Sequence, residues 1–244
     1  MSKITRWTVL TAVSLLILPL GARAADDPPP VPADQFKETI RVACVGDSIT
    51  AGAGAPRGES YPDQLGRMLG EKWQVRNFGV SGSTLLAKGD KPYIKEKAYA
   101  AALEYKPDVV VIALGTNDSK HPTAADAKAP NNWQHKADFA ADYKALIAAF
   151  RQANPKVIVY VCLPVPAFPG RWGINEETIK NEICPIIRTM ASEAKVGVID
   201  LYAALTGKKE MFPDTVHPNK EGAGLLAAEV CRVLTGKAAA KKAA

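Results

Sequence analysis

Asp108 is followed by an unbroken apolar run, Val-Val-Val-Ile-Ala-Leu, and residues 108–114 together have the length of one β-strand. Such runs are buried on both faces and are typical of parallel sheets. Similar strands are expected at 40–45, 74–78, 157–163 and 196–201, and helices at 60–69, 94–104, 136–153, 175–195 and 218–234. Because strands and helices alternate five times, the sequence predicts an α/β fold with a five-stranded parallel sheet covered on both faces.

Polar loops follow the strands of this predicted sheet. Ser48 ends a Gly-Asp-Ser motif, Gly82 lies in a Ser-Gly-Ser-Thr loop, and Asn117 belongs to Gly-Thr-Asn-Asp. A later loop carries Asp214 and His217. Because the carboxyl ends of parallel strands share the edge at which open α/β sheets bind ligands, we expect these side chains to meet.

Together the five residues satisfy the needs of ester hydrolysis. Ser48 needs an adjacent base to become a nucleophile, and His217 can take its proton while Asp214 orients the ring. The backbone N–H groups of Ser48 and Gly82 and the amide of Asn117 are candidate oxyanion donors. Taken singly, Asp214 with His217 could be a capped turn and Asn117 an Asx turn. Their convergence on Ser48 favours an active site.

The four motifs, in this order, resemble the four blocks of the SGNH (GDSL-type) hydrolase superfamily. The resemblance covers about residues 40–234, with Ile49 where the family often has leucine. It implies a three-layer α/β/α, flavodoxin-like fold and a carboxylic-ester hydrolase that needs no cofactor. It also implies catalytic Ser48, Asp214 and His217, with an oxyanion hole of Ser48, Gly82 and Asn117.

The chain divides into four segments. Residues 1–24 have a basic start, an apolar run and Ala22-x-Ala24, as in a secretory signal peptide. A membrane anchor is the alternative, but the apolar run is shorter than the ~20 residues that span a bilayer. We expect a proline-rich linker at 25–38, the hydrolase domain at 39–235 and an Ala/Lys-rich tail at 236–244. The predicted location is therefore exported, either periplasmic or extracellular, with no stable membrane insertion.

Charge and cysteine content exclude other classes. The formal charge is +6, but three basic residues lie in the predicted signal and three in the tail, so the domain is near neutral and shows no basic face for nucleic acid. No Cys/His spacing supports a metal site. Cys44 and Cys162 lie in apolar strand runs, whereas Cys184 and Cys231 lie on separate predicted helices, and whether that pair forms a disulfide stays open.

The irregular segments at 119–134 and 164–175 are expected to select the substrate. Candidate substrate-binding residues are Asp47, Trp133, Phe168, Arg171 and Trp172. Aromatic faces with polar neighbours suit sugar rings, although ordinary loop packing uses the same residues. The segment with Phe168 and Trp172 resembles exported bacterial sialate or xylan acetylesterases. We therefore expect a carbohydrate O-acetylesterase; a lysophospholipase or thioesterase and a non-catalytic sugar-binding module are the alternatives, and the oligomeric state is open.

Overall fold

A single parallel sheet of five strands, in the order β2-β1-β3-β4-β5, forms the centre of the protein. The structure is a computed structural model and describes residues 28–124, 126–170 and 172–237. Its strands are β1 (Ile40–Gly46), β2 (Trp73–Gly79), β3 (Val109–Ala113), β4 (Ile158–Leu163) and β5 (Gly197–Asp200). The five-stranded parallel sheet expected from the sequence is confirmed, with strand bounds within two residues.

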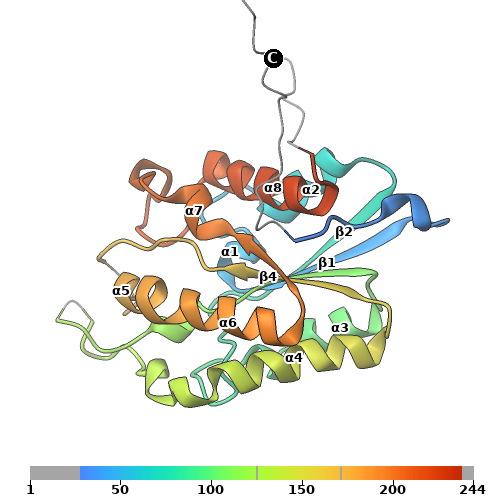
Figure 1. Cartoon of the computed structure of the whole chain (residues 1–244). Helices are drawn as coiled ribbons and strands as arrows, with labels where there is room; N and C mark the ends of the chain where they lie inside the picture. The colour runs from blue at the N-terminus through green and yellow to red at the C-terminus, as the bar shows by residue number, and fades with distance from the viewer. Residues whose placement is uncertain (1–27, 125, 171, 238–244) are drawn as a thin grey trace, which may run out of the picture.

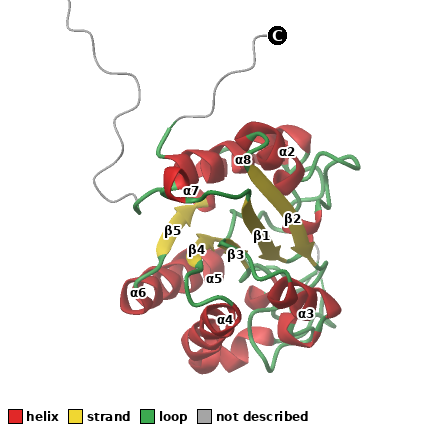
Figure 2. Ribbon diagram, turned by 90° about the vertical axis from the view of Figure 1, so that its right-hand side faces the viewer, coloured by secondary structure: helices red, strands yellow, loops and turns green. Residues whose placement is uncertain are grey.

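Helices cover both faces of this sheet. Figure 1 shows one layer formed by α2 (Tyr61–Leu69), α7 (Leu201–Leu205) and α8 (Lys220–Thr235). The opposite layer contains α3 (Lys97–Glu104), α4 (Phe139–Ala153) and α6 (Cys184–Ala194), and Figure 2 shows the sheet between the two layers. Successive residues of β1 feed opposite cores: Val42 and Cys44 pack in the α2/α8 layer, whereas Ala43 and Val45 pack in the α3/α4/α6 layer.

Short helical turns complete the fold. They are α1 (Ser48–Ala51), α5 (Glu176–Thr178), a π-helical turn η5 (Ile179–Ile183), and the 3₁₀ turns η1 (Ala33–Gln35), η2 (Tyr93–Lys95), η3 (Asn117–Ser119), η4 (Asn132–Asp138) and η6 (Lys209–Met211). A proline inside the helix expected over 175–195 predicts a bend or a break there, and the segment is divided into α5, η5 and α6. Pro185 lies in the first turn of α6, directly after the π turn, where its missing N–H interrupts the regular helical hydrogen bonding.

Two helix starts differ from the sequence prediction. Helix α8 begins at Lys220 rather than Pro218, because the side chain of Asn219 caps it by accepting the N–H of Gly222. Helix α4 begins at Phe139 rather than near residue 136, because the residues before it form the 3₁₀ segment η4, which is itself kinked at His135. By contrast, Ser60 and Asp63 form the capping box that starts α2, one residue from the predicted start.

The described part of the predicted linker packs on the domain. Val31 is buried, and its N–H donates to the carbonyl of Leu234 over 2.9 Å. The hydroxyl of Tyr160 donates to the carbonyl of Pro29. Residues 28–31 therefore extend the α8 side of the core, because Val31 offers an apolar side chain there. The predicted signal peptide and most of the predicted tail lie outside the described residues.

All four cysteines are free and buried. Cys184 packs in the α3/α4/α6 layer and Cys231 in the α2/α8 layer, so the sheet lies between them. That separation explains why these two cysteines do not pair. Within the described ranges, none of the helices combines the length and the apolar content that crossing a membrane requires.

Candidate active site

The predicted site residues meet at the carboxyl edge of the sheet. Strand β1 lies between β2 and β3, so the connections leaving it and β3 diverge and open a crevice there. A pocket of about 330 Å³ lies at this edge and is lined by Ser48, Gly82, Asn117 and His217 among others. We call residues 80–92 the β2 loop and residues 114–121 the β3 loop.

Ser48 is the first residue of α1, directly after the tight turn that ends β1. The carboxylate of Asp47 caps α1 by accepting the N–H of Ile49 over 3.0 Å. Gly46 has no room for a side chain, because a Cβ there would lie 2.1 Å from Oγ1 of Thr50. Ser48 is only 8% exposed and lines the pocket. The cap at Asp47 and the close packing at Gly46 hold its backbone in place.

His217 connects Ser48 to Asp214. Its Nε2 lies 2.8 Å from Oγ of Ser48, and its Nδ1 lies 2.7 Å from Oδ2 of Asp214. Oδ1 of Asp214 accepts the backbone N–H groups of Val216 and His217, which fixes the short turn between acid and base. With the Nδ1 proton directed at Asp214, Nε2 is free to accept the hydroxyl proton of Ser48.

The environment of Asp214 keeps its carboxylate ionised. Burial by itself would raise the pKa of Asp214, but the hydrogen bonds from the backbone and ring of His217 and from Val216 outweigh it, and the pKa lies below its ordinary value. An ionised Asp214 can stabilise the imidazolium that forms when His217 takes a proton. The three side chains can therefore transfer a proton from the Ser48 hydroxyl to a leaving group.

Two hydrogen-bond donors face Ser48 across the pocket from different loops. Gly82, on the β2 loop, has a φ of +82°, a conformation that glycine adopts without strain. Asn117, on the β3 loop, donates one amide hydrogen of Nδ2 to the carbonyl of Ser83 over 3.1 Å. That bond fixes the direction of the second amide hydrogen, and such preorganised donors are what a developing oxyanion requires.

Two buried carboxyl groups lie behind the pocket. Burial raises the pKa of Asp47 to about 6, and Asp47 caps α1 rather than lining the pocket. Burial also raises the pKa of Asp118 to about 7, against the opposing effect of the N–H groups of Leu86 and Leu85, which donate to it over 2.7 and 3.0 Å. Asp118 thereby joins the β3 loop to the β2 loop, a role that the Asx-turn interpretation of its motif did not predict.

The candidate substrate-binding residues occupy different places. Trp172 lines the pocket, and its ring lies edge-on to His217 with centroids 5.3 Å apart. Trp133 packs on Phe139 and donates its Nε1–H to Glu182, while Phe168 packs on Phe212, so neither lines the pocket. Their apolar rings fill cores at the base of the loops. Arg171 lies outside the described residues.

Several pocket residues were not predicted from the sequence. The unpredicted lining residues are Ala53, Ser81, Lys120, Ile174 and Val216. Lys120 has a side chain only 11% exposed and pairs with Asp90 over 3.2 Å. Lys120 follows Asn117 by three residues and ends the same short turn. This spacing is the sequence feature that could have identified Lys120 as a pocket residue.

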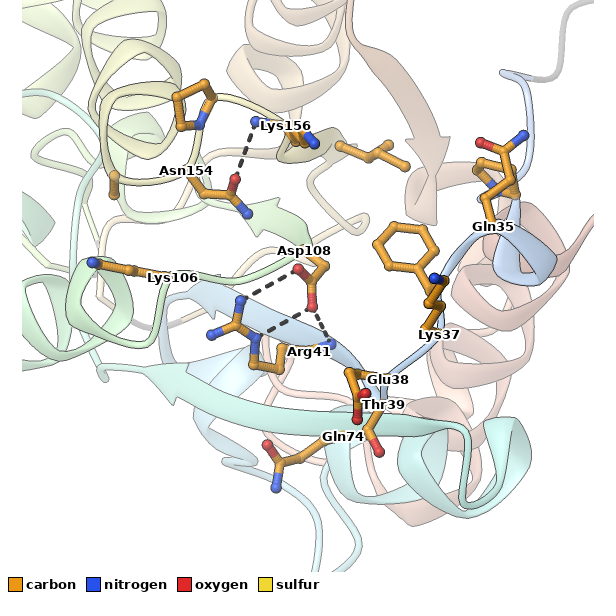
Figure 3. A pocket seen from close by; sticks show the side chains of 15 residues that line it. Gln35, Lys37, Glu38, Thr39, Arg41, Gln74, Lys106, Asp108, Asn154 and Lys156 are labelled. Atoms are coloured by element: carbon orange, nitrogen blue, oxygen red, sulfur yellow. Dashed lines mark hydrogen bonds and ion pairs between the residues drawn. The ribbon is translucent and has the colours of Figure 1, made fainter.

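A second hollow, of about 960 Å³, lies at the opposite edge of the sheet. Figure 3 shows Arg41 and Asp108 at its centre, joined by the N–H and the guanidinium of Arg41. The lining residues include no serine, cysteine or histidine, so nothing there resembles the Ser48–His217 pair. The described residues also contain no cluster of three or more His, Cys, Asp or Glu side chains suited to a metal ion.

Comparison with known proteins identifies the family of the chain. Residues 44–225 match the model of the GDSL-like lipase/acylhydrolase family. The chain is 40% identical to an acetylxylan esterase of Xylanibacter ruminicola, in an alignment that takes in 81% of this chain but only 43% of that protein. The chain thus spans less than half the length of this relative.

Solved structures share the fold. A lipase/acylhydrolase from Enterococcus faecalis is 26% identical with a TM-score of 0.61, over 84% of this chain and 100% of the other. A carbohydrate acetylesterase from Sinorhizobium meliloti is 20% identical with a TM-score of 0.61, over 79% of this chain and 97% of the other. These similarities cover most of the chain and support the three-layer architecture.

Proposed function

The chain belongs to the GDSL-like lipase/acylhydrolase family and is a carboxylic-ester hydrolase, and on that premise we propose that it removes O-acetyl groups from carbohydrates through an acyl-Ser48 intermediate. The observation that carries the proposal is the unbroken relay from Ser48 through His217 to Asp214, with contacts of 2.8 and 2.7 Å. This relay faces Gly82 and Asn117 in one pocket.

Acylation begins when Oγ of Ser48 attacks the ester carbonyl carbon and Nε2 of His217 takes the hydroxyl proton. The carbonyl oxygen becomes an oxyanion, which the N–H groups of Ser48 and Gly82 and the amide of Asn117 stabilise. When the tetrahedral intermediate collapses, the bond to the alcohol oxygen breaks and His217 gives its proton to that oxygen. The sugar hydroxyl leaves and Ser48 carries the acetyl group.

Deacylation repeats these steps with water. His217 removes a proton from a water molecule, whose oxygen attacks the acetyl carbon and restores the oxyanion. The bond from that carbon to Oγ of Ser48 then breaks, and His217 returns the proton to Oγ. Acetic acid is released, and Asp214 stays ionised and holds the imidazolium in each half-reaction.

Two observations support a carbohydrate acetyl ester as the substrate. The 40% identical relative carries the name acetylxylan esterase. In addition, Trp172 is 36% exposed beside His217, and an aromatic face next to the reacting ester can stack on a sugar ring. The aliphatic lining consists of the short side chains Ala53, Ile174 and Val216, which suits a small acyl group.

Acetate release from acetylated xylan tests this proposal directly. We expect release of acetate and, on a panel of p-nitrophenyl esters, a kcat/KM that falls as the acyl chain lengthens from acetyl to palmitoyl. A rising kcat/KM would instead favour the alternative, a lysophospholipase or thioesterase using the same residues. The absence of turnover on every ester, with no labelling by a serine-directed phosphonate, would favour a sugar-binding module.

Export from the cytoplasm is a separate part of the proposal. It rests on the basic, apolar and Ala-x-Ala pattern of residues 1–24, which lie outside the described residues. N-terminal sequencing of protein recovered outside the cytoplasm should begin after Ala24 or Ala25. A mature protein that begins at Met1 would contradict export by this route.

A further inference from the structure

The two oxyanion donors beyond Ser48 come from separate loops, so their spacing depends on what joins these loops. Gly82 lies on the β2 loop and Asn117 on the β3 loop. Stabilisation of an oxyanion requires donors fixed before the reaction, because reorganising them during the reaction costs free energy. The first residue of η4 contacts both of these loops.

That residue is Asn132, which is only 3% exposed. Its Nδ2 donates to the backbone carbonyl of Asn117 over 2.9 Å and to Oδ1 of Asp90 over 2.8 Å. Its Oδ1 accepts the backbone N–H of Asp90 over 2.9 Å. One buried amide thus uses both of its ends to join the β3 loop at Asn117 to the β2 loop at Asp90.

Two further contacts close this network into a ring. The backbone N–H of Asn132 donates to the carbonyl of Lys120 over 3.0 Å, and Nζ of Lys120 pairs with Oδ2 of Asp90 over 3.2 Å. Lys120 itself lines the pocket. The ring therefore lies directly behind the wall that carries the oxyanion donors.

We propose that Asn132 is a positioning residue of the active site, which sets the backbone at Asn117 and through it the direction of the Asn117 amide. The inference rests on the proposed oxyanion role of Asn117. The Asn117 amide already donates one hydrogen to the carbonyl of Ser83 on the β2 loop. The direction of its second hydrogen therefore depends on how the β2 and β3 loops are placed relative to each other. Loss of Asn132 lets the loops shift relative to each other, and small displacements of catalytic groups are costly in rate.

The effect should fall on kcat rather than on KM. An oxyanion exists only in the transition state and the intermediates, so a misplaced donor weakens transition-state binding without weakening substrate binding. A residue that merely stabilised the fold would lower the melting temperature and leave the kcat of the folded fraction unchanged.

A double-mutant cycle with p-nitrophenyl acetate tests the inference. Asn132→Ala is measured alone and together with Asn117→Ala, and Asn131→Ala is the matched control, since Asn131 is exposed and its side chain caps no helix. We expect Asn132→Ala to lower kcat by about 10- to 100-fold with little change in KM. In the Asn117→Ala background the same substitution should change kcat by less than about twofold, because the group it positions is gone. Asn131→Ala should match the wild type in both backgrounds.

Several results would overturn the inference. An unchanged kcat for Asn132→Ala would do so, as would an equal loss of kcat in both backgrounds. If Asn132→Ala does not fold, Asn132→Leu carries the same test, because it keeps nearly the same size but makes none of the hydrogen bonds of the amide. A near-normal kcat for Asn117→Ala alone would instead overturn the proposed oxyanion hole, and the inference with it.

Discussion

Gly54 lies so close to His217 that no side chain fits between them. A Cβ on Gly54 would lie 2.8 Å from Cβ of His217 and 2.6 Å from the carbonyl of Pro218. Gly54 also has a φ of +87°, which other residues rarely adopt. The loop after α1 therefore packs directly against the backbone of the base and helps to fix its position.

We predict that Gly54→Ala lowers kcat by about 10- to 100-fold, because the methyl group displaces the imidazole from Ser48. Gly58→Ala is the matched control: Gly58 has a φ of +81°, but a Cβ added there would meet no atom within 4 Å beyond its chain neighbours. Both variants bear the strain of a positive φ, about 1–2 kcal/mol of stability. Steady-state rates on p-nitrophenyl acetate decide the matter, and equal kcat values for the two variants would refute the contact.

The buried carboxyl group of Asp118 makes stability depend on pH in a defined direction. Because burial raises its pKa from 3.8 to about 7, the folded protein holds this proton more tightly than the unfolded chain does. The contribution to stability is greatest below the unfolded pKa and declines as the pH rises toward 7. This is the opposite of the behaviour of a salt-bridged carboxylate.

Asp118→Asn should remove this dependence while costing about 1–3 kcal/mol at acidic pH. The amide NH2, unlike the hydroxyl oxygen of a protonated carboxyl group, accepts no hydrogen bond, so the N–H of Leu85 or Leu86 loses its acceptor. Urea unfolding at about pH 4, 5.5 and 7 measures the gap between wild type and variant. We expect the gap to shrink as the pH rises. A gap that widens with pH would show that Asp118 is already ionised throughout.

Trp172 should matter for glycans more than for small esters. Its ring borders His217, and removing it takes away a stacking surface worth about 0.5–1.5 kcal/mol. Trp172→Ala should therefore raise KM for acetylated xylan about 2- to 10-fold while leaving KM for p-nitrophenyl acetate nearly unchanged, and Trp172→Phe should retain most of the affinity. An equal loss on both substrates would assign Trp172 to supporting His217 instead.

The sequence predicted those parts of the site that depend on strand order and local motifs. Ser48, Gly82 and Asn117 each come in the connection directly after a strand, so the parallel topology brings them to one edge. His217 comes later, after α7 and η6, and was identified by its Asp-x-x-His motif rather than by the strand before it. The helix start near Ser60 was equally local and was predicted to within one residue. These features need no knowledge of how distant loops pack.

The parts of the site that the sequence did not predict depend on contacts between loops. Asn132 lies in a segment with no periodicity, and nothing local indicates that it reaches Asp90 and Asn117. For the same reason the sequence suggested a substrate-binding role for Trp133 and Phe168, although Trp133 is buried against Phe139 and the partly buried Phe168 packs on Phe212. An aromatic residue in an irregular loop has the same sequence pattern whether it faces a ligand or a core.

Covalent labelling shows whether Ser48 is the nucleophile of the esterase. The wild-type protein is incubated with a fluorophosphonate, and the modified residue and the remaining esterase activity are measured together by peptide mass spectrometry and acetate release. We predict one adduct per chain, on Ser48, with loss of activity in step with labelling, and neither adduct nor turnover in Ser48→Ala. Acetate release by Ser48→Ala at near the wild-type rate, or an adduct on another residue that tracks the loss of activity, would contradict the account.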